Sequence, residues 1–130
     1  MNRTKVTNCT TNRIPCIINF LFSTHPFNRS PIWTNPFYQI YLLDLVSGEN
    51  KLVSPGIGKT TCAWIHPDER SILYSSTHLD TNASLKQTEE LAARISGKAR
   101  KYSWDYDRHY DLFQVDATSG KAQRITSADG

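Results

Sequence analysis

Apolar and polar residues alternate over short runs in the second half of the chain, and turn-forming residues separate these runs. Alternation over about four to eight residues is typical of strands that bury one face. We therefore expect a four-stranded antiparallel sheet in which most strands end at turns rich in Pro, Asp, Ser or Gly. The predicted strands are residues 60–65, 72–77, 110–116 and 122–126.

The first half of the chain carries another copy of this pattern. Ser-Thr-His closes an apolar run at residues 23–25 and again at 76–78. Residues 38–48 match residues 110–120 at their aromatic, apolar, Asp and Ser-Gly positions. Such a repeat indicates units that bury their apolar faces against each other, so we expect a partial sheet packed face to face on the other sheet. Its predicted strands are residues 17–23, 38–45 and 51–54, with any first strand within 4–11.

The second copy is longer because it contains an insertion within residues 79–109. Apolar residues recur there at helical spacing, which predicts a short amphipathic helix. Asn82 can cap the start of this helix and Gly97 can end it. The residues that form the predicted apolar face are Leu85, Leu91, Ala92 and Ile95.

Composition and charge narrow the function classes. The chain has 130 residues, of which 38% are hydrophobic, and a formal net charge of +3, which fits one small domain. Lys and Arg are scattered, so we expect no nucleic-acid surface, which would be denser. No stretch is long enough to insert in a membrane. The apolar run at residues 14–22 follows basic residues, but Pro15 and Asn19 interrupt it, so it forms no convincing signal peptide.

The three cysteines indicate neither a zinc site nor a complete disulfide framework, because their number is odd and no Cys-x-x-Cys pair is present. Cys62 lies in a predicted strand, and we expect it to be a small core residue. A bridge between Cys9 and Cys16 stays open as an alternative.

The densest group of chemically active residues lies just before the third strand of the second copy. In an extended chain, Asp105, Asp107, His109 and Asp111 share one face. Carboxylates this close repel one another unless a cation intervenes, and calcium favours oxygen ligands. We therefore identify a candidate calcium site with ligands Asp105, Asp107 and Asp111. The segment lacks the Gly and terminal Glu of a calcium loop, so the alternative is a solvated strand edge whose acids pair with Arg or Lys.

Support for nucleophilic catalysis is thinner. Ser75, Ser76, His78 and Asp80 are the right residue types, but they lie in one short stretch and no Gly-x-Ser-x-Gly elbow is present. We expect His78 to hold the following loop through hydrogen bonds, since Ser-Thr-His recurs in the first copy. The sequence therefore predicts no catalytic residues.

The motifs of the second copy resemble the TolB-like β-propeller repeat. Residues 63–74 read Ala-Trp-Ile-His-Pro-Asp-Glu-Arg-Ser-Ile-Leu-Tyr, followed by Tyr-Asp-Leu-Phe-Gln-Val-Asp at 110–116 and Ser-Gly-Lys-Ala-Gln-Arg-Ile-Thr at 119–126. The family pattern is aromatic-Ser-Pro-Asp-Gly-Lys, an apolar strand, Ile-Tyr-x-x-Asp and Gly-x-x-x-x-Leu-Thr. The resemblance implies an all-β fold, a partial β-propeller of antiparallel four-stranded blades with a short inserted helix. Its expected parts are an atypical N-terminal segment at 1–16, a partial blade at 17–56, and a blade at 57–130 with a helical insertion at about 82–97.

Two departures from the family pattern fall in one turn. His66 replaces the usual Ser, and Glu69 replaces the usual Gly. Glutamate tolerates a left-handed backbone poorly, so we expect a different turn here. Trp33, Trp64 and Trp104 are expected to pack between blades.

The resemblance also implies a function class. Propellers close with about four to eight blades, so about two blades make a fragment of a longer propeller, and the isolated chain is expected to self-associate. TolB-like propellers bind proteins in the bacterial cell envelope, so the first expectation is a non-enzymatic, periplasmic module for protein–protein interaction. The alternative is an accessory propeller domain of a peptidase with an α/β-hydrolase fold.

Overall fold

The computed structural model describes residues 5–7, 16–20, 35–97 and 106–127, which form two four-stranded sheets and one helix. The first sheet contains β1 (Lys5–Thr7), β2 (Cys16–Phe20), β3 (Gln39–Leu43) and β4 (Asn50–Leu52). The second contains β5 (Thr60–Ile65), β6 (Ser71–Ser76), β7 (Asp111–Asp116) and β8 (Ala122–Arg124). Helix α1 (Ala83–Ile95) lies between β6 and β7 in the sequence.

Each sheet is a simple antiparallel meander, with strand orders β1-β2-β3-β4 and β5-β6-β7-β8. The prediction of an all-β protein with two antiparallel sheets and a short helix is confirmed at this level. The first sheet has four strands, because β1 falls within residues 1–16 and pairs with β2.

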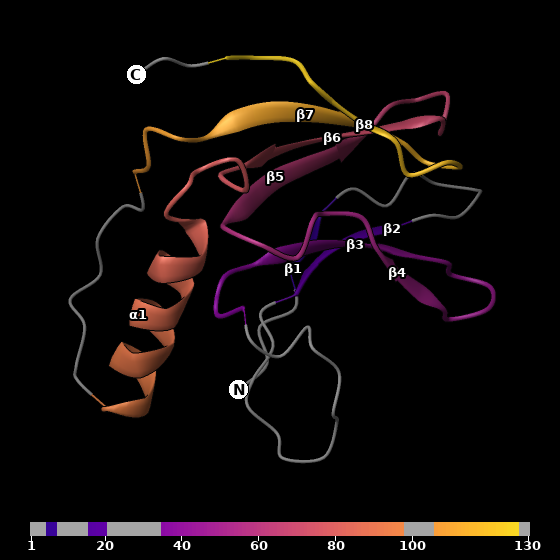
Figure 1. The fold of residues 1–130 in the computed structure, drawn as a ribbon. Helices are drawn as coiled ribbons and strands as arrows, with labels where there is room; N and C mark the ends of the chain where they lie inside the picture. The colour runs from indigo at the N-terminus through magenta and orange to yellow at the C-terminus, as the bar shows by residue number, and fades with distance from the viewer. Residues whose placement is uncertain (1–4, 8–15, 21–34, 98–105, 128–130) are drawn as a thin grey trace.

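The two sheets form stacked layers, with α1 beyond one end of the stack (Figure 1). The core lies between the layers, where Ile40 of the first sheet joins buried residues of the second. On strand β7, Phe113 and Val115 point into this core and are buried. Leu112 and Gln114 alternate with them, face away from the first sheet and are exposed. Burying each such aliphatic or aromatic side chain contributes about 1.5–3 kcal/mol. The buried partners of Ile40 are Ala63, Ile65, Ile72, Tyr74, Phe113 and Val115.

The repeat seen in the sequence recurs at the level of hydrogen bonds. The carboxylate of Asp44 accepts from the Ser47 N–H at 2.9 Å, and that of Asp116 accepts from the Ser119 N–H at 2.6 Å. Both turns then close through a glycine at positive φ, 76° at Gly48 and 72° at Gly120. Equivalent residues therefore build the same turn in both sheets.

A second equivalence lies at the opposite ends of the same strands. The Ile40 N–H donates to Ser54 Oγ at 3.0 Å, and the Leu112 N–H donates to Thr126 Oγ1 at 2.9 Å. Each hydroxyl in turn donates to the side chain preceding its partner, Ser54 to Gln39 and Thr126 to Asp111. Leu112 is therefore the structural counterpart of Ile40.

The turn between β5 and β6 differs from our expectation. Glu69 does not force another turn; it adopts the left-handed conformation itself, with φ of 59°. The turn closes through a bond from the Glu69 N–H to the His66 carbonyl at 2.8 Å, and the His66 N–H donates to the Ser71 carbonyl at 2.9 Å. These bonds hold a conformation that costs a non-glycine residue about 1–2 kcal/mol.

Two expectations for β5 were wrong. Cys62 is exposed rather than part of the core, because the strand pairing is irregular between Thr61 and Trp64 and Cys62 has a positive φ of 55°. Trp64 is exposed as well and contacts His66 edge to face, so it does not pack between the two sheets. Trp33 and Trp104 lie outside the described residues.

Helix α1 forms where the sequence predicted it, but its predicted apolar face is not the buried one. Gly97 follows the helix at φ of 65°, as expected for a helix end, whereas the Asn82 side chain makes no capping bond. Leu85 and Ile95 are exposed, and Gln87 and Glu90 are buried instead. Gln87 is drawn inward because its Oε1 accepts from the Gly58 N–H at 2.7 Å, which satisfies a buried donor.

Candidate functional site

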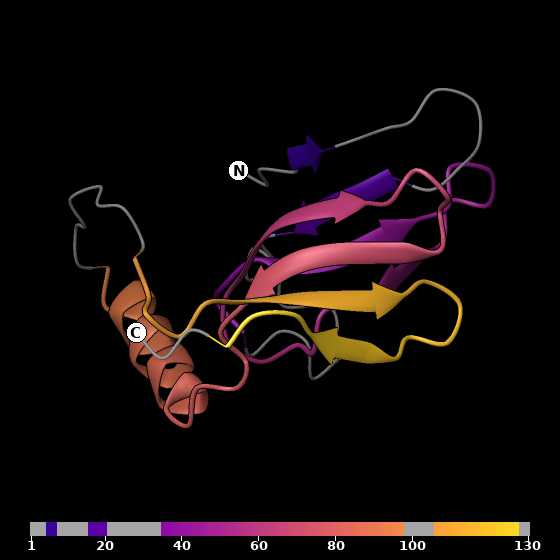
Figure 2. The same ribbon diagram turned by 90° about the horizontal axis from the view of Figure 1, so that it is seen from above.

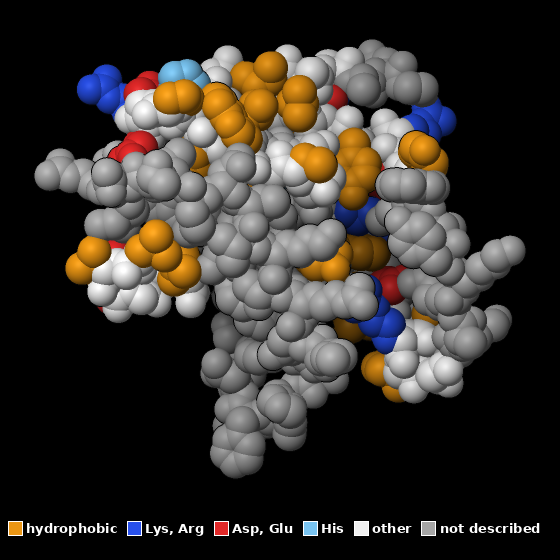
Figure 3. All heavy atoms as spheres, turned by 180° about the vertical axis from the view of Figure 1, so that it is seen from behind, with side chains coloured by type: hydrophobic (Ala, Val, Ile, Leu, Met, Phe, Trp, Pro, Cys, Tyr) orange, Lys and Arg blue, Asp and Glu red, His pale blue; other side chains and the backbone are white. Residues whose placement is uncertain are grey.

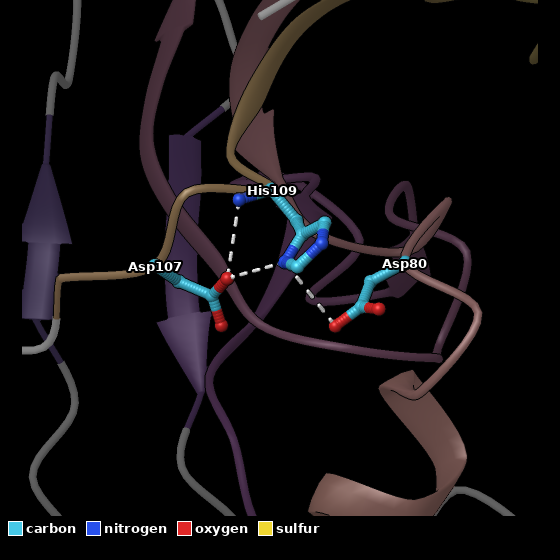
Figure 4. A group of neighbouring side chains, drawn as sticks. All are labelled: Asp80, Asp107 and His109. Carbon is cyan, nitrogen blue, oxygen red and sulfur yellow. Dashed lines mark hydrogen bonds and ion pairs between the residues drawn. The ribbon is translucent and has the colours of Figure 1, made fainter. Parts of the chain in front are cut away.

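Two aspartates and a histidine meet at the end of the second sheet where β6 ends and β7 begins (Figure 4). Asp80 lies in the turn between β6 and α1, and it accepts a bond from the Asn82 N–H at 2.9 Å. Asp107 and His109 lie in the segment that leads into β7. The antiparallel order of β6 and β7 therefore brings these three residues together.

Two lysines neutralise the aspartates. Lys86 Nζ lies 2.6 Å from Asp80 Oδ2 and 2.9 Å from Asp107 Oδ2. Asp80 Oδ2 is buried and has no partner in hydrogen-bond geometry, so its contact with Lys86 Nζ is an ion pair. Lys59, from the loop before β5, places its Nζ 3.3 Å from Asp107 Oδ2. Two carboxylates thus face two ammonium groups, and the aspartate side chains are almost fully buried.

His109 completes the cluster from the solvent side. Its Nδ1 lies 3.0 Å from Asp107 Oδ1 and 3.5 Å from Asp80 Oδ2. The His109 N–H also donates to Asp107 Oδ1 at 3.1 Å, which holds the segment in a tight turn. The imidazole is partly exposed, so solvent reaches this side of the cluster.

The cluster stabilises the ionised carboxylates. Burial would raise the pKa of Asp107, but hydrogen bonds from Lys86, from His109 and from Lys59 outweigh it and hold the pKa well below its usual range. The Lys86 ammonium likewise lowers the pKa of Asp80. Asp80, and then Asp107, raise the pKa of Lys86. All three groups are therefore charged at neutral pH.

The same three side chains could serve as metal ligands. One ligand atom each from Asp80, Asp107 and His109 lies within 4.8 Å of the others. Two carboxylate oxygens and an imidazole nitrogen suit zinc better than calcium, which favours oxygen alone. However, Lys86 already lies between the carboxylates, so an entering cation has to displace its ammonium group.

The predicted calcium ligands do not all take part in this cluster. Asp107 is at its centre, whereas Asp111 lies on β7 and binds the guanidinium of Arg124, with Nε at 3.0 Å, and the Thr126 hydroxyl. Asp105 lies outside the described residues. Lys59, Lys86 and Asp80 were missed as members, because they come from other loops and from α1.

The repeat shows what Asp107 replaces in the other copy. Its counterpart in the first copy is Asn35, which makes the same turn by accepting from the Phe37 N–H at 2.9 Å. The Asn35 amide donates to the carbonyls of Gly56 and Gly58, in the loop that joins the two sheets. The second copy replaces this amide with a carboxylate, so the same position binds ammonium groups instead of carbonyls.

Ser76 and His78 contact each other where β6 ends. Ser76 is 1% exposed, so its hydroxyl is buried. Its Oγ lies 2.9 Å from His78 Nδ1 and accepts from the His78 N–H at 3.2 Å. His78 packs against Phe113 with ring centroids 4.3 Å apart. These contacts hold the loop after β6, as the sequence predicted for His78.

Comparisons with models of known protein families, with curated proteins and with solved structures found no match for this chain. The TolB-like resemblance therefore rests on the repeat motifs and stays a prediction. Among the described residues, no helix is long and apolar enough to cross a membrane.

Proposed function

We propose that this chain is a two-blade segment of a TolB-like propeller that binds another protein and carries out no catalysis. The observation that carries the proposal is the outward apolar side of α1. Leu85, Ala92 and Ile95 lie on one side of the helix, at spacings of seven and three residues, and all are exposed. An apolar stripe on an exposed helix is a recognised mode of docking into a groove of a partner.

The charged cluster supports this role by fixing the helix. Lys86 and Gln87 face the body of the protein, where they bind Asp80, Asp107 and the Gly58 N–H. With these polar side chains turned inward, the apolar stripe has to face solvent, because the two sets lie on different sides of the helix. The cluster therefore presents the stripe rather than reacting with a substrate.

The position of the helix fits a binding surface. Figure 1 shows α1 beyond one end of the stacked sheets, away from the turn between β3 and β4. Leu79 and Tyr106, near the two ends of the insertion, are also exposed. The family resemblance supports a partner in the bacterial cell envelope, which is part of the proposal.

Site-specific photocrosslinking in the source cells tests the proposal. A photoreactive amino acid replaces Ile95, which is 83% exposed on α1, or Val46, which is 79% exposed in the opposite turn. We expect Ile95 to give a discrete adduct with one other protein and Val46 to give none. Equal labelling from both positions, or none from either, would contradict a binding role for the helix.

A further inference from the structure

Donor atoms of Asp80, Asp107 and His109 converge at the end of the second sheet. His109 Nδ1 lies 3.0 Å from Asp107 Oδ1 and 3.5 Å from Asp80 Oδ2. On a tetrahedral zinc ion with bonds of about 2.0–2.2 Å, neighbouring donor atoms lie about 3.3–3.6 Å apart. The two measured distances are close to this spacing, and Figure 4 shows the imidazole directed at both carboxylates.

Contacts on the far side of each carboxylate hold these donor atoms in place. The Asn82 N–H donates to Asp80 Oδ1 at 2.9 Å, so Oδ2 is the oxygen that faces His109. The Asp80 side chain is 1% exposed, and its Oδ2 accepts no hydrogen bond from the described residues. Lys59 Nζ lies 3.3 Å from Asp107 Oδ2, on the side away from His109. Partners of this kind orient the ligands of metal sites.

Ions can reach the cluster from solvent. In Figure 2, α1 and the segment that leads into β7 lie at the same end of the second sheet. Figure 3 shows acidic and basic side chains next to one another at the surface, on the side of the molecule that carries α1. The side chains of His109 and Lys86 are 41% and 33% exposed. A cation can therefore enter beside His109 while the ammonium group of Lys86 moves out into water.

Lys86 occupies the place of a cation, because its Nζ lies 2.6 Å from Asp80 Oδ2. Its flexible side chain and strongly hydrated charge make this contact exchangeable. Zinc brings two positive charges instead of one, and it binds imidazole as well as carboxylate. We propose that zinc binds Asp80 Oδ2, Asp107 Oδ1 and His109 Nδ1 in exchange for the ammonium group of Lys86. Calcium favours oxygen ligands alone and gains nothing from His109.

Isothermal titration calorimetry of the full chain with zinc alone tests this exchange. We expect the wild type to bind one zinc ion at this site. His109→Gln removes a partly exposed ligand and should weaken binding at least about tenfold. Lys86→Ala should strengthen binding at least about tenfold, because no ammonium group then competes for the carboxylates. His66→Gln is the matched control: His66 Nδ1 also lies beside an aspartate, 2.8 Å from Asp68 Oδ1, and its loss should leave the affinity unchanged.

Each other outcome overturns the proposal. A wild type that binds no zinc shows that Lys86 keeps the site closed, and a Lys86→Ala variant with wild-type affinity shows that no exchange occurs. Binding that survives His109→Gln, or that is lost in His66→Gln or in a variant of the exposed thiol, Cys62→Ser, places the zinc elsewhere.

A second measurement applies if Lys86→Ala fails to fold by circular dichroism. The wild type is then acetylated with acetic anhydride, with and without zinc, and the modified lysines are counted by mass spectrometry. Zinc should increase the reactivity of Lys86 and leave that of Lys51, an exposed lysine on β4, unchanged. A Lys86 reactivity that zinc does not change would contradict the exchange.

Discussion

At the scale of single residues, the turn between β5 and β6 stores backbone strain at Glu69. Its φ of 59° lies in the region that glycine adopts without cost. The Glu69 side chain is exposed, and the bond that closes the turn comes from the backbone N–H. The strain is therefore a property of the residue type and not of a contact that the side chain makes.

We predict that Glu69→Gly stabilises the protein by about 0.5–1 kcal/mol, because glycine removes the left-handed penalty and loses only part of this gain to chain entropy. Urea denaturation gives the free energy of unfolding. Glu69→Ala is the control, since alanine keeps the penalty and should give no gain. A glycine variant no more stable than the alanine variant would show that the turn is not strained.

The charged cluster predicts a pH-dependent stability. Asp107→Asn removes an acceptor from Lys86 and Lys59, and we expect it to lower the free energy of unfolding by about 1–3 kcal/mol at pH 7. This is less than the cost of breaking a fully buried ion pair, because Lys86 is partly exposed. The native pKa values of Asp80 and Asp107 lie below those of the unfolded chain, so their contribution is present above about pH 5 and is lost as the pH falls towards about 2.

Urea denaturation at several pH values checks this sign. The difference between wild type and Asp107→Asn should shrink as the pH falls. Glu89→Gln is the control, because Glu89 is an exposed acid on α1 that makes no ion pair with either lysine. A difference that stays constant down to low pH would mean that the ion pairs contribute nothing to stability.

The position of Lys86 predicts the response to cations. Its ammonium group lies between the carboxylates of Asp80 and Asp107, so we expect the melting temperature of the wild type to be the same in calcium as in excess chelator. Lys86→Ala leaves the carboxylates without this partner, and a divalent cation should then raise its melting temperature. A rise with calcium in the wild type would support the metal site predicted from the sequence.

At the scale of elements, the sequence predicted the strands of the second sheet well and the helix surface poorly. Strands β5 to β8 follow from the alternation of residues such as Phe113 and Val115 with Leu112 and Gln114, which is a local signal. The buried side of α1 depends on Gln87 meeting Gly58, a contact between distant segments that no local pattern carries. For the same reason, Asp107 was identified as a site residue but its partners Lys59 and Lys86 were not.

The loop between the sheets predicts a further effect on stability. Gly58 has φ of 70°, and an added Cβ would lie 3.1 Å from the backbone of His78. Gly120 has a similar φ, with nothing within 4 Å of an added Cβ. We therefore expect Gly58→Ala to lower the free energy of unfolding by about 1 kcal/mol or more beyond the effect of Gly120→Ala. Both alanines adopt the unfavourable left-handed backbone, but only the one at position 58 also clashes with a neighbouring segment. Thermal unfolding of both variants measures this difference. Equal losses of stability would show that the loop at Gly58 does not lie close to the backbone of His78.

At the scale of the whole molecule, the repeat explains both the architecture and its open side. The sequence predicted two sheets packed face to face because residues 38–48 match 110–120, and the structure repeats the same turns and hydrogen bonds in both sheets. Which apolar side chains are exposed at the end of the stack could not be predicted from the pattern alone. Apolar positions such as Leu112 have the same periodicity whether a neighbour covers them or not.

The two sheets share one core through the face that carries Ile40. Methyl-labelled protein studied by nuclear magnetic resonance tests this most directly. We predict cross-relaxation between the methyl groups of Ile40 and those of buried second-sheet residues such as Ile65, Ile72 and Val115. Contacts confined to residues within each sheet, with none between Ile40 and the second sheet, would show that the two sheets do not share a core.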